Sequence, residues 1–366
     1  MLENHYRFKE VEAGRFYVYE TPEDIPGCWK RHRGKDYWEY RRQWNENALN
    51  NVAGDFPINI DLELTSRCNL RCRYCKRTSM YNGNRLVSGD MDWSLVTKVL
   101  DETAGRLQAL KLNIRGEPLM YPKVAEAIDY AKKRGVVEVL MNTNGMLLTE
   151  TMAERLLHAG LDTVIFSFDH VDKERFEAGR VGAKYETVVK NIRRMARLKR
   201  EGGYQHVKIR ANVFFDTDRE KELAPLWNLF GGDLDEFTIS KVNPTPDVTG
   251  IDLDACAEHF DDVAWICHQP WQRLGIFNDG GVIFCCTDFE GAMRVGNARE
   301  KSVHDLYHSH VVNTLRTYHF QRKGYKVPLC RSCHNFIYQI IKYYHEVLQQ
   351  PYPVRPEKSR SVQRAC

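Results

Sequence analysis

The chain has 366 residues, a length that suggests about two domains. Its 43% hydrophobic and 28% charged residues are typical of a soluble globular protein, and a net charge of +4 is too small to indicate a nucleic-acid or membrane-surface partner. The sequence has no 18-residue apolar stretch and no apolar run near its start that resembles a signal peptide. We therefore expect a cytoplasmic protein, in a reducing compartment where its 11 Cys favour metal binding or catalysis over disulfides.

An N-terminal arm, residues 1–56, is rich in Tyr, Trp and Arg and precedes a region of alternating strands and helices, residues 57–242. Strands are expected at 58–64, 109–114, 136–141, 163–168, 207–215 and 236–240, and helices at 93–106, 122–134, 150–159, 185–200 and 219–230. This alternation predicts an α/β fold with a parallel sheet, either open or curved into a partial (β/α)6 TIM-like barrel. In βα barrels the chemistry takes place in loops at the carboxyl ends of the strands.

Three cysteines directly follow the first expected strand. Cys68, Cys72 and Cys75 have the spacing C-x3-C-x2-C. Three thiolates can hold three irons of a [4Fe–4S] cluster and leave the fourth iron open to a substrate or cofactor. Structural zinc is the alternative, but such sites usually take four ligands and no fourth ligand lies nearby in the sequence.

This cysteine group after a strand resembles that of the radical S-adenosylmethionine (SAM) superfamily. The segment Asn113-Ile-Arg-Gly-Glu-Pro118 resembles the family's GGEP motif, with Arg115 in place of the first Gly. The resemblance covers roughly residues 57–242. It implies that Glu117 accepts a hydrogen bond from the SAM amino group.

Three further residues are candidate SAM contacts by the same resemblance. Asn144 lies in the segment Asn-Thr-Asn-Gly after the third strand, Ser167 ends the fourth strand and Asn212 lies on the fifth. For Ser167 and Asn212 the alternative is ordinary capping at a strand end. The resemblance also implies the chemistry: the open iron chelates SAM, and one electron breaks a C–S bond to give methionine and a 5′-deoxyadenosyl radical, which removes a hydrogen atom from an unactivated C–H bond. A flavodoxin or ferredoxin-type reductant would supply that electron.

A second cysteine group lies beyond an expected linker at residues 243–250. Residues 267–285 predict a β-hairpin around the turn Asn278-Asp-Gly-Gly281, with Cys267 and Cys285 near its ends. After a helix expected at 302–318, Cys330 and Cys333 complete four thiolates, a full ligand set for [4Fe–4S] or for zinc. Adjacent side chains of a strand point to opposite faces, so only one of Cys285 and Cys286 can face the metal, and we choose Cys285.

Residues 251–350 resemble the Twitch domain, the shortened form of the SPASM domain, here a small hairpin-plus-helix unit. This resemblance favours iron–sulfur over zinc. Only Cys366, in an expected tail at 351–366, follows Cys333, so a second auxiliary cluster would lack ligands. We therefore expect two [4Fe–4S] clusters in all. The cysteine spacing is most similar to that of the radical SAM dehydrogenases of aminoglycoside and aminocyclitol biosynthesis, the type that oxidises 2-deoxy-scyllo-inosamine.

The expected function is oxidation of a secondary alcohol of a sugar, cyclitol or aminoglycoside to a ketone, with the auxiliary cluster accepting an electron. One alternative is an epimerase in which Cys256 or Cys286 donates a hydrogen atom. Another is a ribosomal-peptide maturase, although the 56-residue arm is short for the peptide-recognition domain of such enzymes. The sequence identifies neither the substrate nor the base that takes the hydroxyl proton.

Overall fold

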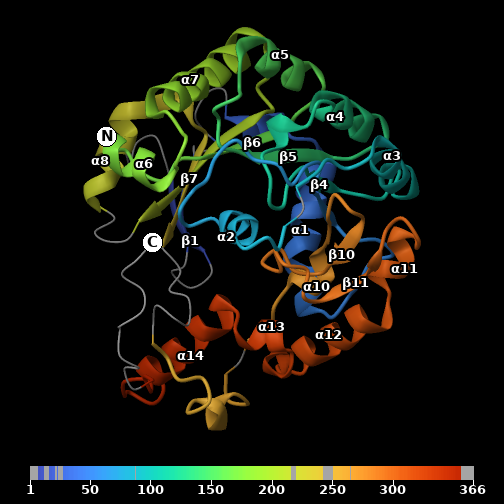
Figure 1. Ribbon diagram of the computed structural model, residues 1–366, viewed down its shortest axis with the longest axis vertical. Helices are drawn as coiled ribbons and strands as arrows, with labels where there is room; N and C mark the ends of the chain where they lie inside the picture. The colour runs from blue at the N-terminus through green and yellow to red at the C-terminus, as the bar shows by residue number, and fades with distance from the viewer. Residues whose placement is uncertain are drawn as a thin grey trace. The chain divides into compact units, whose positions relative to one another are not determined.

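The computed structural model describes residues 7–11, 16–20, 23, 28–86, 88–215, 220–241, 250–263 and 265–355 (Figure 1). The chain forms two compact units, Met1–Val242 with Gln269–Val312, and Asn243–His268 with Asn313–Cys366. Most of the expected linker, and the expected tail from residue 356 on, lie outside the described residues. No described helix is long and apolar enough to cross a membrane.

An 11-stranded sheet is the frame of the first unit. The strands are β1 (Arg7–Val11), β2 (Phe16–Glu20), β3 (Asn59–Leu62), β4 (Ala109–Lys111), β5 (Glu138–Thr143), β6 (Thr163–Ser167), β7 (Lys208–Phe215), β8 (Glu236–Lys241), β9 (Arg273–Ile276), β10 (Gly281–Ile283) and β11 (Arg294–Asn297). Their order is β1-β2-β8-β7-β6-β5-β4-β3-β9-β10-β11. Neighbours from β8 through β3 to β9 are parallel, whereas the outer pairs at both edges are antiparallel.

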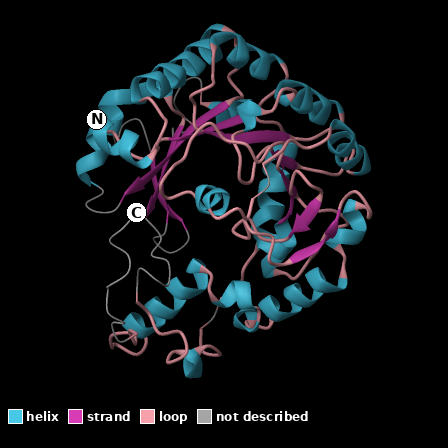
Figure 2. Cartoon of the chain, in the orientation of Figure 1, coloured by secondary structure: helices cyan, strands magenta, loops and turns pink. Residues whose placement is uncertain are grey.

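Helices connect the consecutive parallel strands and cover one face of the sheet (Figures 1 and 2). They are α3 (Trp93–Glu102), α4 (Val124–Lys133), α5 (Glu150–His158), α7 (Tyr185–Glu201) and α8 (Glu220–Phe230). On α7, Val188, Ile192 and Met195 recur at helical spacing and are buried. The predicted partial TIM-like barrel is therefore confirmed, with its six strands and five helices within a few residues of their expected bounds.

The helix expected at 302–318 is wrong in one respect, because it is two helices, α11 (Val303–Tyr307) and α12 (His310–Phe320). The break follows from local capping. The hydroxyl of Ser309 accepts a hydrogen bond from the backbone N of Val312 at 3.5 Å, which starts a new helix. The sequence analysis also missed α1 (Lys35–Leu49), α2 (Lys76–Asn82) and α6 (Lys173–Gly179).

The alternation of side chains gives the sheet two unlike faces. On β7, Ile209, Ala211 and Val213 are fully buried on the side of the helices. Lys208 and Arg210 therefore point to the opposite side, which we call the inner face. Helix α1 closes this face at the amino-terminal ends of the strands, where the aromatic rings of its residues pack with the chain before it. This apolar cluster contains Cys28, Trp29, Tyr37, Tyr40, Ile58 and Ala109.

The second unit has a small core of its own. Helix α14 (His334–Glu346) buries Phe336, Ile340 and Tyr344 against residues 251–263, among them Cys256 and Phe260. The short helix α13 (Pro328–Arg331) precedes α14 along the chain. A single β-bridge between Ile251 and Val354 joins the two ends of this unit.

Candidate active site

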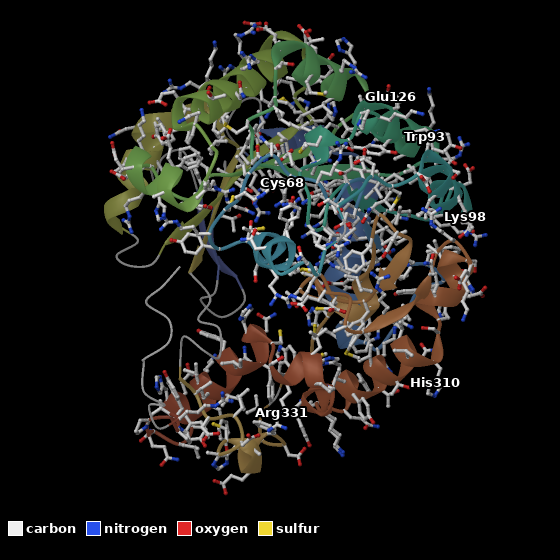
Figure 3. The ribbon with its side chains drawn as sticks, in the orientation of Figure 1. Cys68, Trp93, Lys98, Glu126, His310 and Arg331 are labelled. Carbon is white, nitrogen blue, oxygen red and sulfur yellow. The ribbon has the colours of Figure 1, made fainter. Side chains whose placement is uncertain are left out.

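The first cysteine group lies in one loop between the carboxyl end of β3 and the start of α2. Cys68, Cys72 and Cys75 are partly exposed and form no disulfide. Cys75 occupies the N-cap position of α2, and its backbone N donates to the carbonyl oxygen of Cys72 at 3.2 Å. Figure 3 shows Cys68 inside the curve of the sheet, whereas Trp93 lies among the outer helices.

The donor set of this loop fits a [4Fe–4S] cluster with one open iron, because it offers three thiolates and no fourth cysteine. Burial raises the pKa of the Cys72 thiol to about 11, with further upward effects from Cys75 and Cys68. The three sulfurs are thus close enough to affect one another's ionisation, and a bound cation would favour the thiolate forms. Within the described residues, no three or more His, Cys, Asp or Glu side chains already stand in a metal-binding arrangement.

Two side chains from distant parts of the chain approach the thiols. Asn144 Nδ2 lies 3.9 Å from Cys68 Sγ, and an Arg180 guanidinium nitrogen lies 3.9 Å from Cys72 Sγ. Asp169 holds Arg180 through a 2.7 Å ion pair. Donors beside cluster thiolates stabilise their negative charge and raise the reduction potential. Asn144 was expected at this site, but no pattern in the sequence indicated Arg180.

The motif after β4 is fixed directly against the cysteine loop. A Cβ added to Gly116 would lie 2.1 Å from the carbonyl oxygen of Thr65 and 2.7 Å from that of Arg67, so no other residue fits without a shift of the backbone. The backbone N of Glu117 donates to the carbonyl oxygen of Arg67 at 2.8 Å. The two motifs therefore form one rigid structure, and this explains the Gly before Glu117.

The carboxylate of Glu117 is fully buried and already has three partners. It accepts hydrogen bonds from Thr143 Oγ1 at 2.8 Å, from the backbone N of Asn144 at 2.7 Å and from that of Leu119 at 3.1 Å. Burial raises the pKa of Glu117 to about 7 in spite of these bonds. A carboxylate has about four acceptor positions, so about one remains for an ammonium group such as that of SAM.

Arg115, the departure from the GGEP pattern, has a structural role. Its guanidinium forms a bidentate ion pair with the buried Glu63, with distances of 2.6 and 2.7 Å, and lies 3.8 Å from the centre of the Phe277 ring. It also donates to the carbonyl oxygen of Phe289 at 3.2 Å. Arg115 therefore ties the loop after β4 to β3 and to the loops on both sides of β10.

Ser167 is the last residue of β6, and it pairs in register with Asn212 in the middle of β7. The side chain of Asn212 accepts a hydrogen bond from Arg210 Nε at 3.0 Å. Both residues lie on the inner face by the alternation of their strands. The structure thus brings them together, and their contact with SAM stays a prediction.

The second cysteine group is divided between the two units. Cys285 and Cys286 follow β10 in the first unit, and the predicted hairpin of β9 and β10 is confirmed. Cys267, Cys330 and Cys333 belong to the second unit. The four-thiolate ligand set, and the choice of Cys285 over Cys286, stay predictions.

Within the second unit, His319 connects two of these cysteines. Its Nδ1 accepts from the backbone N of Cys267 at 3.4 Å, and its Nε2 lies 3.4 Å from Cys330 Sγ. Burial lowers the pKa of His319 to about 4, so the ring is neutral and Nε2 carries its single proton toward the sulfur. No pattern in the sequence indicated this contact.

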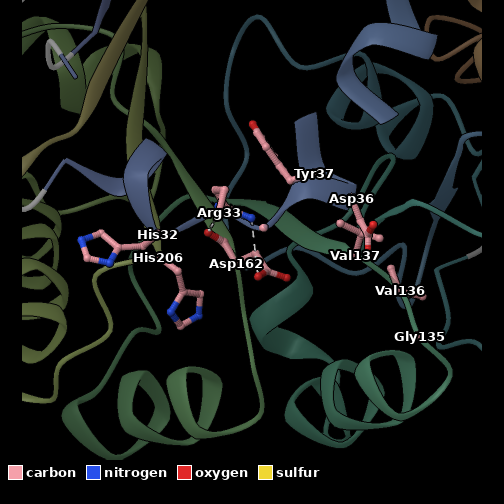
Figure 4. Close-up of a pocket in the computed structure, with 10 residues that line it drawn as sticks. His32, Arg33, Asp36, Tyr37, Gly135, Val136, Val137, Asp162 and His206 are labelled. Carbon is pink, nitrogen blue, oxygen red and sulfur yellow. Dashed lines mark hydrogen bonds and ion pairs between the residues drawn. The ribbon is translucent and has the colours of Figure 1, made fainter. Parts of the chain in front are cut away.

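A cavity of about 300 Å³ lies at the other end of the sheet. Arg33, Tyr37, Asp162 and His206 are among the residues that line it (Figure 4). Asp162 and His206 directly precede β6 and β7, so the cavity is at the amino-terminal ends of the strands. The cysteine loop is at their carboxyl ends, and the cavity is therefore not a part of the candidate active site.

Two family models match this chain, and each spans one of the cysteine groups. Residues 62–224 match the radical SAM superfamily, and residues 267–334 match the iron–sulfur cluster-binding SPASM domain. The chain therefore contains a radical SAM domain and an iron–sulfur cluster-binding SPASM domain. The first domain implies a [4Fe–4S] cluster and SAM as cofactors, and the second implies auxiliary iron–sulfur binding.

The individual relatives share only low sequence identity with this chain. A tungsten-containing aldehyde ferredoxin oxidoreductase cofactor-modifying protein of Pyrococcus furiosus is 26% identical over 74% of this chain and 86% of its own length. The structure of Streptococcus suis SuiB bound to precursor peptide SuiA has a TM-score of 0.55 at 14% identity, covering 87% of this chain and 79% of that chain. BtrN in complex with AdoMet and 2-DOIA has a TM-score of 0.48 at 20% identity, covering 75% and 92%. Matches at such identities concern the fold and do not identify a substrate.

Proposed function

We propose that this radical SAM enzyme is a dehydrogenase, which oxidises a secondary alcohol of a sugar, cyclitol or aminoglycoside intermediate to a ketone. The observation that carries the proposal is the number of cysteines available as ligands for auxiliary clusters. The SPASM match ends at residue 334, and only Cys366 follows it. Cys267, Cys285, Cys330 and Cys333 then serve one auxiliary cluster, which has no open iron for substrate and is suited to electron transfer.

The bound cofactors supply a 5′-deoxyadenosyl radical, which takes a hydrogen atom from the carbinol carbon, and an auxiliary cluster, which takes up the electron released with the hydroxyl proton. The overall reaction is alcohol plus SAM to ketone, 5′-deoxyadenosine, methionine and a proton. SAM is the net two-electron oxidant, and no external electron acceptor is needed, since the electron from the alcohol replaces the one used to cleave SAM. A flavodoxin or ferredoxin-type reductant is needed to prime the enzyme.

The residues of the chain have separate tasks in this proposal. Cys68, Cys72 and Cys75 hold the first cluster, and Glu117 orients SAM through its amino group. Asn144 and the positively charged Arg180 stabilise the thiolates of the first cluster. The segment Asn113–Pro118 packs against the cysteine loop, and this packing keeps the cysteines and Glu117 in place before SAM binds.

The epimerase alternative requires a cysteine that reaches the substrate. Cys256 does not suit that task, because it is fully buried in the core of the second unit and burial raises its pKa. Cys286 is partly exposed, and it is the candidate donor for an epimerase. The burial of Cys256 therefore favours Cys286 as the donor in this alternative.

The test is anaerobic incubation of the reconstituted enzyme with SAM, a reductant and a panel of sugars and aminocyclitols. We expect a product two mass units lighter than its substrate and one 5′-deoxyadenosine per ketone. The protein should contain about eight irons per chain, as two four-iron clusters. An iron content near four per chain would show that the auxiliary cluster is absent, and it would rule out the proposed dehydrogenase. Modification of a peptide in place of a sugar or aminocyclitol would favour a maturase.

A further inference from the structure

His319 lies in the second unit between two of the proposed ligands of the auxiliary cluster. It is near the end of α12, and its side chain is fully buried. Its Nδ1 accepts a hydrogen bond from the backbone N of Cys267 at 3.4 Å, and its Nε2 lies 3.4 Å from Cys330 Sγ. One imidazole ring thus contacts the backbone of one proposed ligand and the sulfur of another, and no step of the proposed reaction uses it.

The surroundings of this ring confine it to one position. A Cβ added to Gly324 would lie 2.4 Å from His319 Cε1 and 2.5 Å from its Nδ1, so a larger residue at 324 would push the ring away. The ring of Trp265 meets the imidazole edge-on, with 5.2 Å between the ring centres. The imidazole is therefore held by a close approach of the backbone, an aromatic contact and two polar contacts.

The backbone of Cys267 decides which ring nitrogen carries the proton. A ring nitrogen that accepts a hydrogen bond carries no proton itself, so the single proton of a neutral imidazole is on the other nitrogen. Because Nδ1 of His319 accepts from the backbone N of Cys267, the N–H is at Nε2 and faces Cys330 Sγ. His319 is therefore a hydrogen-bond donor to this sulfur, and its Nε2 has no lone pair to offer to a metal.

A donor at a cluster thiolate changes how easily the cluster takes up an electron. Reduction adds negative charge to the cluster and its sulfurs, so a hydrogen bond to a ligating sulfur is stronger in the reduced state and raises the reduction potential. The low dielectric of a buried site increases this effect. A raised potential suits a cluster that takes up the electron of an oxidised alcohol.

We infer that His319 is a positioning residue of the auxiliary cluster, which donates from Nε2 to Cys330 Sγ and thereby raises the reduction potential of that cluster. The inference rests on the proposed function in one respect, the assignment of Cys330 as a ligand. It predicts that the N–H group of His319 sets the potential, and that the size and packing of the ring do not.

A redox titration followed by electron paramagnetic resonance tests the inference apart from turnover. The full chain carries Ala in place of Cys68, Cys72 and Cys75, so that the second cluster alone gives the signal. In this background His319→Leu removes the donor, and the equilibrium constant for reduction should fall about tenfold, which is about 59 mV for one electron. Iron content and melting temperature, measured on the same samples, report whether the cluster and the fold are kept.

Two amide variants separate the donor from the packing. Gln carries an amide N–H at about the reach of Nε2, so His319→Gln should keep most of the potential. Asn is shorter and its oxygen replaces only Nδ1, so His319→Asn should keep the contact with the backbone of Cys267 and lower the potential as His319→Leu does. His310→Leu, at the exposed start of the same helix, is the matched control and should leave the potential unchanged.

Two further measurements do not depend on a folded His319→Leu variant. Gly324→Ala pushes the imidazole away from its position, so it should lower the potential although His319 is still present. Pulsed electron paramagnetic resonance of the same background chain with isotope-labelled histidine should show a weak coupling between the reduced cluster and one ring nitrogen. His319→Gln should remove this coupling.

Three results would overturn the inference: an unchanged potential in His319→Leu, an equal fall of the potential in His319→Gln and His319→Leu, or loss of the iron of the second cluster in both. The second result would assign the effect to packing, and the third would make His319 a ligand. If the potentials shift as expected but no ketone forms, the dehydrogenase fails and the role of His319 stands. If ketone forms and His319→Leu leaves the potential unchanged, the opposite holds.

Discussion

The two cysteine groups differ in how the chain builds them. Cys68, Cys72 and Cys75 lie in one loop of one unit, and the neighbouring motif is fixed to that loop by a 2.8 Å backbone hydrogen bond. The second group extends from Cys267 to Cys333 and is divided between two units. A site made within one loop can be recognised from spacing alone, whereas a site assembled from distant segments depends on tertiary structure.

The largest effect should follow from removal of the first group. Replacement of Cys68, Cys72 and Cys75 together by Ala should abolish formation of 5′-deoxyadenosine, because no cluster remains to reduce SAM. The absorbance of the second cluster should persist, since its proposed ligands are elsewhere. Cys256→Ala, which removes a buried thiol of the second unit, is the control and should keep SAM cleavage. SAM cleavage by the triple variant would contradict the assignment.

Loss of one ligand from the second cysteine group should separate SAM cleavage from ketone formation. Cys285→Ala should still cleave SAM but form little ketone, because the electron of the oxidised alcohol has no acceptor. Cys286→Ala is the matched control, one residue away and equally a partly exposed cysteine. The measurement is ketone and 5′-deoxyadenosine in the same reaction. The reverse pattern would make Cys286 the ligand.

Gly116→Ala should damage the first site through packing alone. The new Cβ meets the carbonyl oxygen of Thr65 at 2.1 Å, so the loop must move. We expect a loss of about 3 kcal/mol in the free energy of unfolding and slower SAM cleavage, measured by thermal denaturation and product assay. Gly105→Ala, with nothing within 4 Å of the added Cβ, is a control for stability, although its positive φ adds some strain. An unchanged Gly116→Ala would show that the cysteine loop is not rigid.

Glu117→Gln should have a smaller effect, mainly on SAM, although its amide nitrogen must face at least one backbone or hydroxyl donor that now bonds the carboxylate. Gln keeps the size of Glu and one acceptor oxygen, but it loses the charge that attracts an ammonium group. We expect SAM to bind about tenfold more weakly, with the cluster content unchanged. Equilibrium dialysis with SAM and iron analysis measure the two quantities. Equal SAM affinity in the variant would mean that the carboxylate serves only its three protein partners.

The sequence was sufficient to predict what local patterns encode. Alternating apolar runs predicted β3 to β8, six of the parallel strands, and the turn at Asn278–Gly281 predicted the hairpin, where Gly280 has a φ of +90°. The contact of Arg180 with Cys72 joins residues 108 positions apart, and that of Tyr40 with Glu138 joins residues 98 apart. Such contacts leave no periodic signal, and so the residues around the thiols and the charged inner face required the structure.

The most direct test of the proposed reaction is the mass of the product formed in deuterium oxide. A dehydrogenase releases hydrogen as an atom to the adenosyl radical and as a proton to solvent, so no solvent hydrogen becomes fixed at the carbinol carbon. We predict a product two mass units lighter than the substrate, with one 5′-deoxyadenosine for each ketone, in deuterium oxide as in ordinary water. A product one mass unit heavier than the substrate in deuterium oxide, formed in dependence on Cys286, would show an epimerase and contradict the account.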